Sequence, residues 1–133
     1  MKEKLQNLLK NAYSPYYNFK VAAIVVTKDG NLFGGVNVEN ANGTSICAER
    51  NAIASAVAAG YKKGDFNKIY IMFENGKIGY PCFACRQVLL EFFESDNIIT
   101  CISNELEEEK TLKELCPYTF DSEDLKWEAV LLV

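Results

Sequence analysis

Apolar residues recur at helical spacing in some segments of this chain and as β-branched runs in others, which predicts a mixture of helices and strands. Residues 2–12 are expected to form an amphipathic helix that ends before Pro15. Its apolar positions are Leu5, Leu8, Leu9 and Ala12. Residues 19–28 are apolar and β-branched, and Asp29-Gly30 is typical of a hairpin turn before a returning strand over 32–39.

The middle of the chain alternates between the two kinds of pattern. Residues 47–59, which are rich in alanine, and residues 82–94 are expected to be helices, whereas 68–74 and 97–103 are expected to be strands. The charged stretch from Glu105 to Lys110 is expected to be a solvated loop. This order predicts an α/β fold with helices on both faces of a mixed sheet of about five strands.

The C-terminal part contains two capping signals. Thr111 to Glu114 has the form of a capping box, so a short helix is expected there, and Pro117 stops it. Asp121-Ser122 is expected to cap one further turn, and the apolar residues 129–133 are compatible with a subunit contact. We see no repeat, linker or low-complexity segment, and expect residues 1–133 to form a single domain.

The charge balance bears on the choice of partner. The chain has 18 acidic and 14 basic residues, a net charge of -4, which gives no electrostatic reason to bind a nucleic acid polymer. A small neutral ligand or another protein chain is the expected partner. No apolar run approaches the roughly 20 residues of a membrane helix, and residues 1–10 lack the features of a signal peptide. We therefore expect a cytoplasmic protein with no membrane partner.

The chain has five cysteines and no histidine. Cytoplasmic thiols stay reduced, so the cysteines are expected to be metal ligands, catalytic groups or core residues rather than disulfides. Serine–histidine and cysteine–histidine catalysis within one chain are excluded. A general acid or base must then be a carboxylate, Lys, Tyr or Cys. A transition-metal site must use mainly thiolates and carboxylates.

Cys82 and Cys85 follow Pro81 at the start of a predicted helix. Their spacing places both sulfurs on one helix face, and the helix N-terminus favours the thiolate form. The pair alone fits zinc ligands, a redox dithiol or two buried cysteines. Cys47, at the start of another predicted helix, adds a third ligand, which favours a catalytic zinc site because such sites keep one position for water. Cys101 and Cys116 lack such a pairing, and we interpret them as core or local packing.

Charged residues lie beside the candidate ligands. Arg50 and Arg86, the only arginines, are each within one helical turn of a ligand cysteine. A guanidinium that donates to a thiolate would withdraw charge from the site; the other interpretation is two surface arginines. Glu49 could carry protons between water and substrate, or could simply stabilise the first helical turn.

Cys47-Ala48-Glu49-Arg50 together with Pro81-Cys82-x-x-Cys85-Arg86-Gln87 resembles the paired signature of the cytidine deaminase family. Further segments resemble the family in the same order along the chain. They are residues 12–16, Phe19-x-Val21, residues 37–41, and Glu114-Leu115-x-Pro117-x-x-Phe120. The resemblance covers most of residues 12–125.

The resemblance implies a three-layer α/β/α fold and hydrolytic deamination of cytidine and deoxycytidine to the uracil nucleosides plus ammonia, in pyrimidine salvage. It implies one zinc per chain, held by Cys47, Cys82 and Cys85, that activates water for attack on C4 of the base. Glu49 would carry protons to N3 and to the leaving amine. Arg50 would support the ligand sulfurs.

The resemblance also assigns substrate-binding residues and an assembly. Phe19 would pack on the base, beside Ala48. Asn37 and Glu39, which alternate on one face of a strand, would bind the ribose hydroxyls. Phe120 would reach the site of a neighbouring subunit in a homotetramer.

The chain departs from the family pattern at several positions. Phe83 and Tyr80 replace small residues beside a ligand cysteine, the loop over 42–46 is about one residue short and lacks a tyrosine, and Ala22 replaces a common glycine. Three other functions stay open: a deaminase of another cytosine nucleoside such as blasticidin S, a non-catalytic zinc-binding assembly module, and a dithiol oxidoreductase using Cys82 and Cys85.

Overall fold

A computed structural model describes residues 1–127, so the apolar residues 129–133 lie outside the described part. The strands are β1 (Val21–Thr27), β2 (Leu32–Val36), β3 (Phe66–Phe73), β4 (Ile98–Ile102) and β5 (Glu107–Thr111). The helices are α1 (Lys2–Leu9), α2 (Ala48–Ala58), α3 (Phe83–Phe92), α4 (Leu112–Leu115) and the 3-10 helix η1 (Ser122–Leu125).

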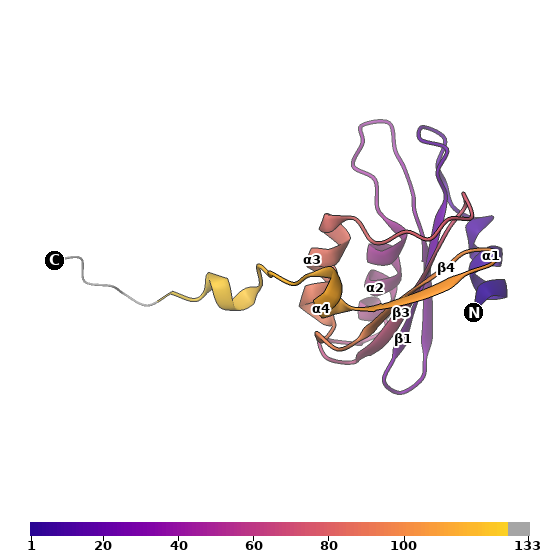
Figure 1. The fold of residues 1–133 in the computed structure, drawn as a ribbon. Coiled ribbons are helices and arrows are strands. Elements are labelled where there is room, and N and C mark those ends of the chain that lie inside the picture. The colour runs from indigo at the N-terminus through magenta and orange to yellow at the C-terminus, as the bar shows by residue number, and fades with distance from the viewer. Residues whose placement is uncertain (128–133) are drawn as a thin grey trace.

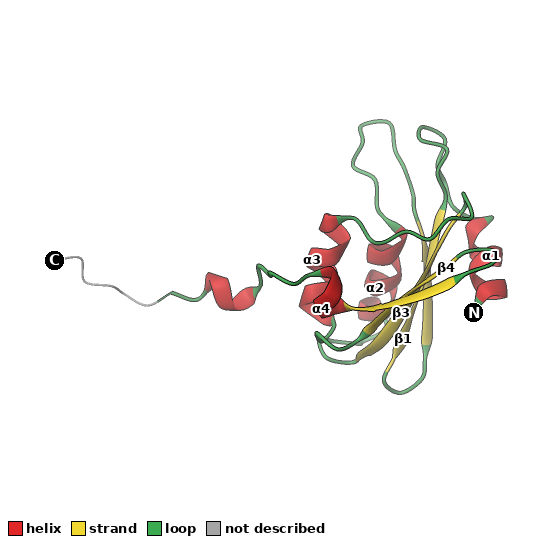
Figure 2. Cartoon of the chain, viewed as in Figure 1, coloured by secondary structure: helices red, strands yellow, loops and turns green. Residues whose placement is uncertain are grey.

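The five strands form one mixed sheet in the order β2-β1-β3-β4-β5. Only β3 and β4 are parallel; the other neighbours are antiparallel. Helix α1 lies on one face, whereas α2 and α3 lie on the other (Figures 1 and 2). The predicted three-layer α/β/α fold with a mixed five-stranded sheet is confirmed. Within residues 1–127, no helix combines the length and apolar character that crossing a bilayer requires.

The central strand β1 is buried along almost its whole length, because both of its faces are covered. Successive side chains of a strand point to opposite faces. Ala23 and Val25 therefore join the core beneath α2 and α3, while Ala22 and Ile24 join a smaller cluster with Leu5 of α1. This burial explains why residues 21–26 show a continuous apolar run rather than alternation.

The prediction of a solvated loop over Glu105 to Lys110 is wrong. Most of it belongs to β5, which pairs antiparallel with β4 in the register Ile98↔Thr111 to Ile102↔Glu107. The glutamates of β5 are exposed at the sheet edge, where charged side chains hinder pairing with other chains. The local sequence disfavours a strand, but backbone hydrogen bonds to β4 override that weak preference. The expected bounds of 2–12 and 32–39 are also too long by about three residues.

Strand β2 and the first turn of α2 approach each other closely. A Cβ atom built on Gly35 would lie 2.3 Å from the backbone nitrogen of Ala52 and 2.6 Å from the carbonyl oxygen of Ala48. Only glycine allows this contact, since real Cβ atoms do not come so close to backbone. The first turn of α2 is thereby held against the sheet.

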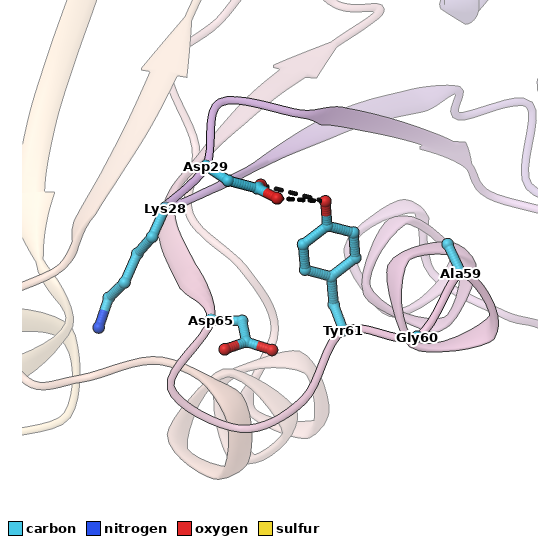
Figure 3. Close-up of a pocket in the computed structure, with 6 residues that line it drawn as sticks. All are labelled: Lys28, Asp29, Ala59, Gly60, Tyr61 and Asp65. Carbon is cyan, nitrogen blue, oxygen red and sulfur yellow. Dashed lines mark hydrogen bonds between the residues drawn. The ribbon is translucent and has the colours of Figure 1, made fainter.

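The opposite end of β1 contains the expected hairpin turn. The Tyr61 hydroxyl, just after α2, contacts both carboxylate oxygens of Asp29, at 2.8 and 3.1 Å (Figure 3). Hydrogen bonds from Thr27 and then Tyr61 lower the pKa of Asp29. The pocket around these residues lies at the C-terminal end of α2, away from the N-termini of the helices that bear the candidate ligands.

Candidate functional site

Three cysteine sulfurs converge where α2 and α3 begin. Cys47 is the N-cap residue of α2, Cys82 is the N-cap residue of α3, and Cys85 lies in the first turn of α3. The three Sγ atoms all lie within 4.8 Å of one another, with 4.0 Å between Cys47 and Cys82 and 3.5 Å between Cys82 and Cys85. A tetrahedral zinc with Zn–S bonds of about 2.3 Å separates its sulfurs by about 3.8 Å. The cluster therefore fits a zinc ion.

The backbone of both helices leaves these sulfurs free for a ligand. Cys47 and Cys82 have the extended conformation of N-cap residues, but neither side chain caps its helix. The N-terminal ends of α2 and α3 both favour negative charge at this place. A hydrogen bond from Cys85, and then the adjacent Arg50 guanidinium, lower the pKa of Cys47 to about 5 against the effect of burial.

Cys85 is fully buried. Its hydrogen bond to Cys47, followed by burial, raises the pKa of the Cys85 thiol. A metal ion binds the thiolate, so binding at this cluster requires that proton to leave. All five cysteines of the chain are free thiols, and Cys101 is buried in the core, where the sequence placed it.

The two arginines have different roles. Arg50 donates a hydrogen bond from Nη2 to the Cys47 sulfur at 3.3 Å, which is the contact that the sequence suggested. Within residues 1–127, Arg86 donates no hydrogen bond to a sulfur atom. It donates from Nε to the Pro81 carbonyl and from Nη1 to the Leu115 carbonyl, both at 2.8 Å.

Glu49 lies in the first turn of α2 and is only 4% exposed. Burial raises the pKa of its carboxyl group, and the negative charge of Cys47 acts in the same direction. The Glu49 side chain lines the same pocket as Cys47 and Cys82. A carboxyl group of raised pKa beside a set of cysteines that can hold a metal ion is suited to take and release protons.

The pocket has a volume of about 420 Å³, which is in the range of small-molecule sites. Phe19, Asn37, Glu39 and Ala48, all expected from the sequence to contact a substrate, line it. Gly43, Ser45 and Ile46 of the short loop over 42–46 also line the pocket. The lining residues Tyr17 and Phe73 were not anticipated.

Phe73 forms an aromatic wall with Phe19, with ring centroids 5.4 Å apart. The pairing of Val21 with Phe73 brings the end of β3 to the start of β1. Gly79 makes room for this ring, because a Cβ built there would lie 1.8 Å from it. Sequence spacing contains no signal for Phe73, since only the register of β1 and β3 places it in the pocket.

Asn37 and Glu39 line the pocket, and their side chains also hydrogen-bond to backbone groups of the neighbouring segments. The Asn37 amide accepts from the Val21 backbone at 2.8 Å and donates to the Phe19 carbonyl at 2.7 Å. The Glu39 carboxylate accepts from the backbone nitrogens of Tyr16 and Tyr17 and from the Ser14 hydroxyl.. Both groups keep further hydrogen-bonding capacity for a ligand.

The remaining sequence-predicted residues lie elsewhere. Phe120 is outside this pocket, in a groove along α3 that it shares with Phe83 and Arg86. Phe83 is 80% exposed and its ring covers the Arg86 guanidinium at 4.6 Å. Tyr80, in contrast, lines the pocket beside Cys82. Of the two aromatic replacements near the ligand cysteine, only Tyr80 shapes this pocket.

Comparisons with known proteins agree with this geometry. The model of the cytidine and deoxycytidylate deaminase zinc-binding region matches residues 1–101. A cytidine deaminase of Mycoplasma genitalium is 42% identical over 104 residues, covering 77% of this chain and 78% of that protein. A cytidine deaminase of Halalkalibacterium halodurans is 35% identical over 128 residues, 94% of each chain. The crystal structure of cytidine deaminase from Burkholderia pseudomallei superimposes with a TM-score of 0.83 and 39% identity, covering 89% of this chain and 94% of that chain.

Proposed function

This chain belongs to the cytidine and deoxycytidylate deaminase family, and from this premise we propose how its residues divide the work of the reaction. The enzyme removes the amino group at C4 of cytidine or deoxycytidine by hydrolysis, which yields ammonia and the uracil nucleoside. The observation that supports this function most directly is one pocket lined by Cys47, Cys82 and Glu49, beside the fully buried Cys85.

Cys47, Cys82 and Cys85 are the proposed ligands of one zinc ion per chain. When bound, zinc supplies the positive charge that makes a water molecule acidic near neutral pH. Three thiolates on a dication leave a net negative centre. Arg50 offsets that charge, because its Nη2 donates to the Cys47 sulfur.

Glu49 is the proposed proton carrier. Its carboxylate takes one proton from water and passes it to N3 of the base while the water oxygen bonds to C4. It then takes the remaining hydroxyl proton and passes it to the amino group, so that the C4–N bond breaks and ammonia leaves. Burial of the side chain supports this role, since a raised pKa brings a carboxyl group closer to the pH at which it both accepts and donates.

The substrate contacts follow from the lining of the pocket. Phe19, with Phe73 beside it, packs on the base, next to Ala48. Asn37 and Glu39 bind the ribose hydroxyls with the hydrogen-bonding capacity that their backbone contacts leave free.

The proposal includes an assembly and a location. Phe120, which is 58% exposed, reaches the pocket of a neighbouring subunit in a homotetramer. The segment after α4 extends away from the body of the molecule (Figure 1), which supports such an exchange. The single domain acts in the cytoplasm, in pyrimidine salvage, where its free cysteines stay reduced.

The test is loss of cytidine ultraviolet absorbance with purified protein, with zinc assayed on the same sample. We expect about one zinc per chain and turnover of cytidine and deoxycytidine. Zinc without turnover of cytidine, deoxycytidine or blasticidin S, all tested in the same panel, would support a non-catalytic zinc module instead. Absence of both zinc and turnover would favour the dithiol alternative.

A further inference from the structure

The contacts of Arg86 lead us to propose that it is a positioning residue for the ligand Cys82: its side chain holds the peptide group that precedes Cys82 and anchors it to the end of α4. This inference rests on the proposed zinc ligands, and it concerns retention of the metal rather than the chemical step alone.

Arg86 donates two hydrogen bonds to carbonyl groups beside Cys82. Its side-chain Nε donates to the Pro81 carbonyl at 2.8 Å, and its backbone nitrogen donates to the Cys82 carbonyl at 2.9 Å. These two carbonyls belong to the peptide groups that precede and follow Cys82. The backbone bond is the ordinary i→i−4 bond of the helix and would form with most residues at this position. The contribution of the Arg86 side chain is the bond to Pro81, beside the extended Cys82 backbone that places its sulfur at the cluster.

The other end of the guanidinium has a fixed anchor. Nη1 donates to the carbonyl of Leu115 at 2.8 Å, the last residue of α4, where helix carbonyls have no partner within the helix. Helix α4 is itself fixed by the capping box of Thr111 and Glu114. A planar guanidinium can bridge two carbonyls at once, whereas an ammonium is a point donor on a flexible stem.

Phe83 also restrains the Arg86 side chain. Its ring lies over the Arg86 guanidinium at 4.6 Å, in a cation–π contact. Since Phe83 is 80% exposed and lies outside the substrate pocket, its contact with Arg86 is the role that the structure supports. The ring shields one face of the guanidinium from water and restricts its movement.

Cys82 is the ligand that most needs such support. It is exposed, whereas Cys47 is half-buried and Cys85 is buried. Loss of the metal is therefore expected to begin at Cys82, and a looser Pro81–Cys82 backbone should speed that loss.

The test is Arg86→Lys in the full-length zinc-loaded enzyme. We expect release of zinc to a chromogenic chelator to become about 10–100-fold faster, the range typical for residues that orient metal ligands. We expect kcat to fall more than KM rises, because Arg86 itself does not line the substrate pocket. Phe83→Ala, a change at an exposed position that should fold, is expected to speed zinc release by a smaller factor.

Gln87→Ala is the matched control. Gln87 neighbours Arg86 on α3 and donates to the Phe120 carbonyl at 2.7 Å, so its removal loosens the C-terminal segment without touching Pro81. Zinc release should stay at the wild-type rate. If Gln87→Ala matches Arg86→Lys, or if both Arg86→Lys and Phe83→Ala keep the wild-type release rate, the inference is overturned. A wild-type protein without zinc would instead refute the proposed function.

Discussion

The Arg50 guanidinium donates to the Cys47 sulfur across 3.3 Å, so a positive charge on α2 touches a proposed metal ligand on the same helix. The contact joins the N-cap residue of α2 to a residue of its first turn. It therefore depends on local helix geometry and on the inward direction of both side chains.

Replacement of Arg50 by Gln should weaken the site. An uncharged amide withdraws less charge from the sulfurs, so we expect kcat or zinc affinity to fall by about 10–100-fold. Steady-state kinetics on zinc-loaded protein, together with chelator competition, measure both. The interpretation of Arg50 fails if the variant matches the wild type in both measurements.

Replacement of Glu49 by Gln should separate metal binding from chemistry. The amide is nearly isosteric but cannot carry a proton, so we expect zinc content to stay normal and kcat to fall by at least about 10²–10⁴-fold. Zinc analysis and single-turnover kinetics on the same preparation check this. Near-normal activity would rule out Glu49 as the proton carrier.

Replacement of Cys82 by Ala should remove both metal and stability, because metal binding is coupled to folding. We expect little bound zinc and a lower midpoint of thermal unfolding. Cys116→Ala is the control, since Cys116 lies outside the sulfur cluster; it should retain zinc. A folded, active and zinc-loaded Cys82→Ala protein would contradict the ligand assignment.

Replacement of Glu39 by Gln should change how stability depends on pH. Burial tends to raise the pKa of Glu39, but hydrogen bonds from Ser14, Tyr17 and Tyr16 outweigh it and lower the pKa below its ordinary value of 4.5. The charged form is thus favoured in the folded state. Its stabilising effect is present above the unfolded pKa and is lost as pH falls through the lower folded pKa.

We therefore expect Glu39→Gln to be less stable than the wild type at pH 7, with a difference that shrinks in acid below the folded pKa. Denaturant unfolding at both pH values measures it. The exposed Glu91 supplies a control, since Glu91→Gln should have little effect at either pH. A stability difference that is equal at pH 7 and in acid would show that the ionised carboxylate is not responsible.

The sequence alone determined the parts of this protein that depend on short separations. The spacing of Cys82 and Cys85 and the position of Glu49 after Cys47 identify helix N-termini that bear sulfur and carboxylate, because residues within one turn are neighbours in any helix. The β-branched and apolar residues 19–28 likewise predicted the strand that forms β1.

Only the tertiary structure decided the parts that depend on strand register and on contacts between distant segments. Pairing with β4 made residues 107–111 a strand despite their charge, and pairing of β1 with β3 placed Phe73 beside Phe19. Phe83 follows the ligand Cys82 in the sequence, but its side chain faces Arg86 and lies outside the substrate pocket. Register and packing arise from the summed burial of many residues, so no local pattern encodes them.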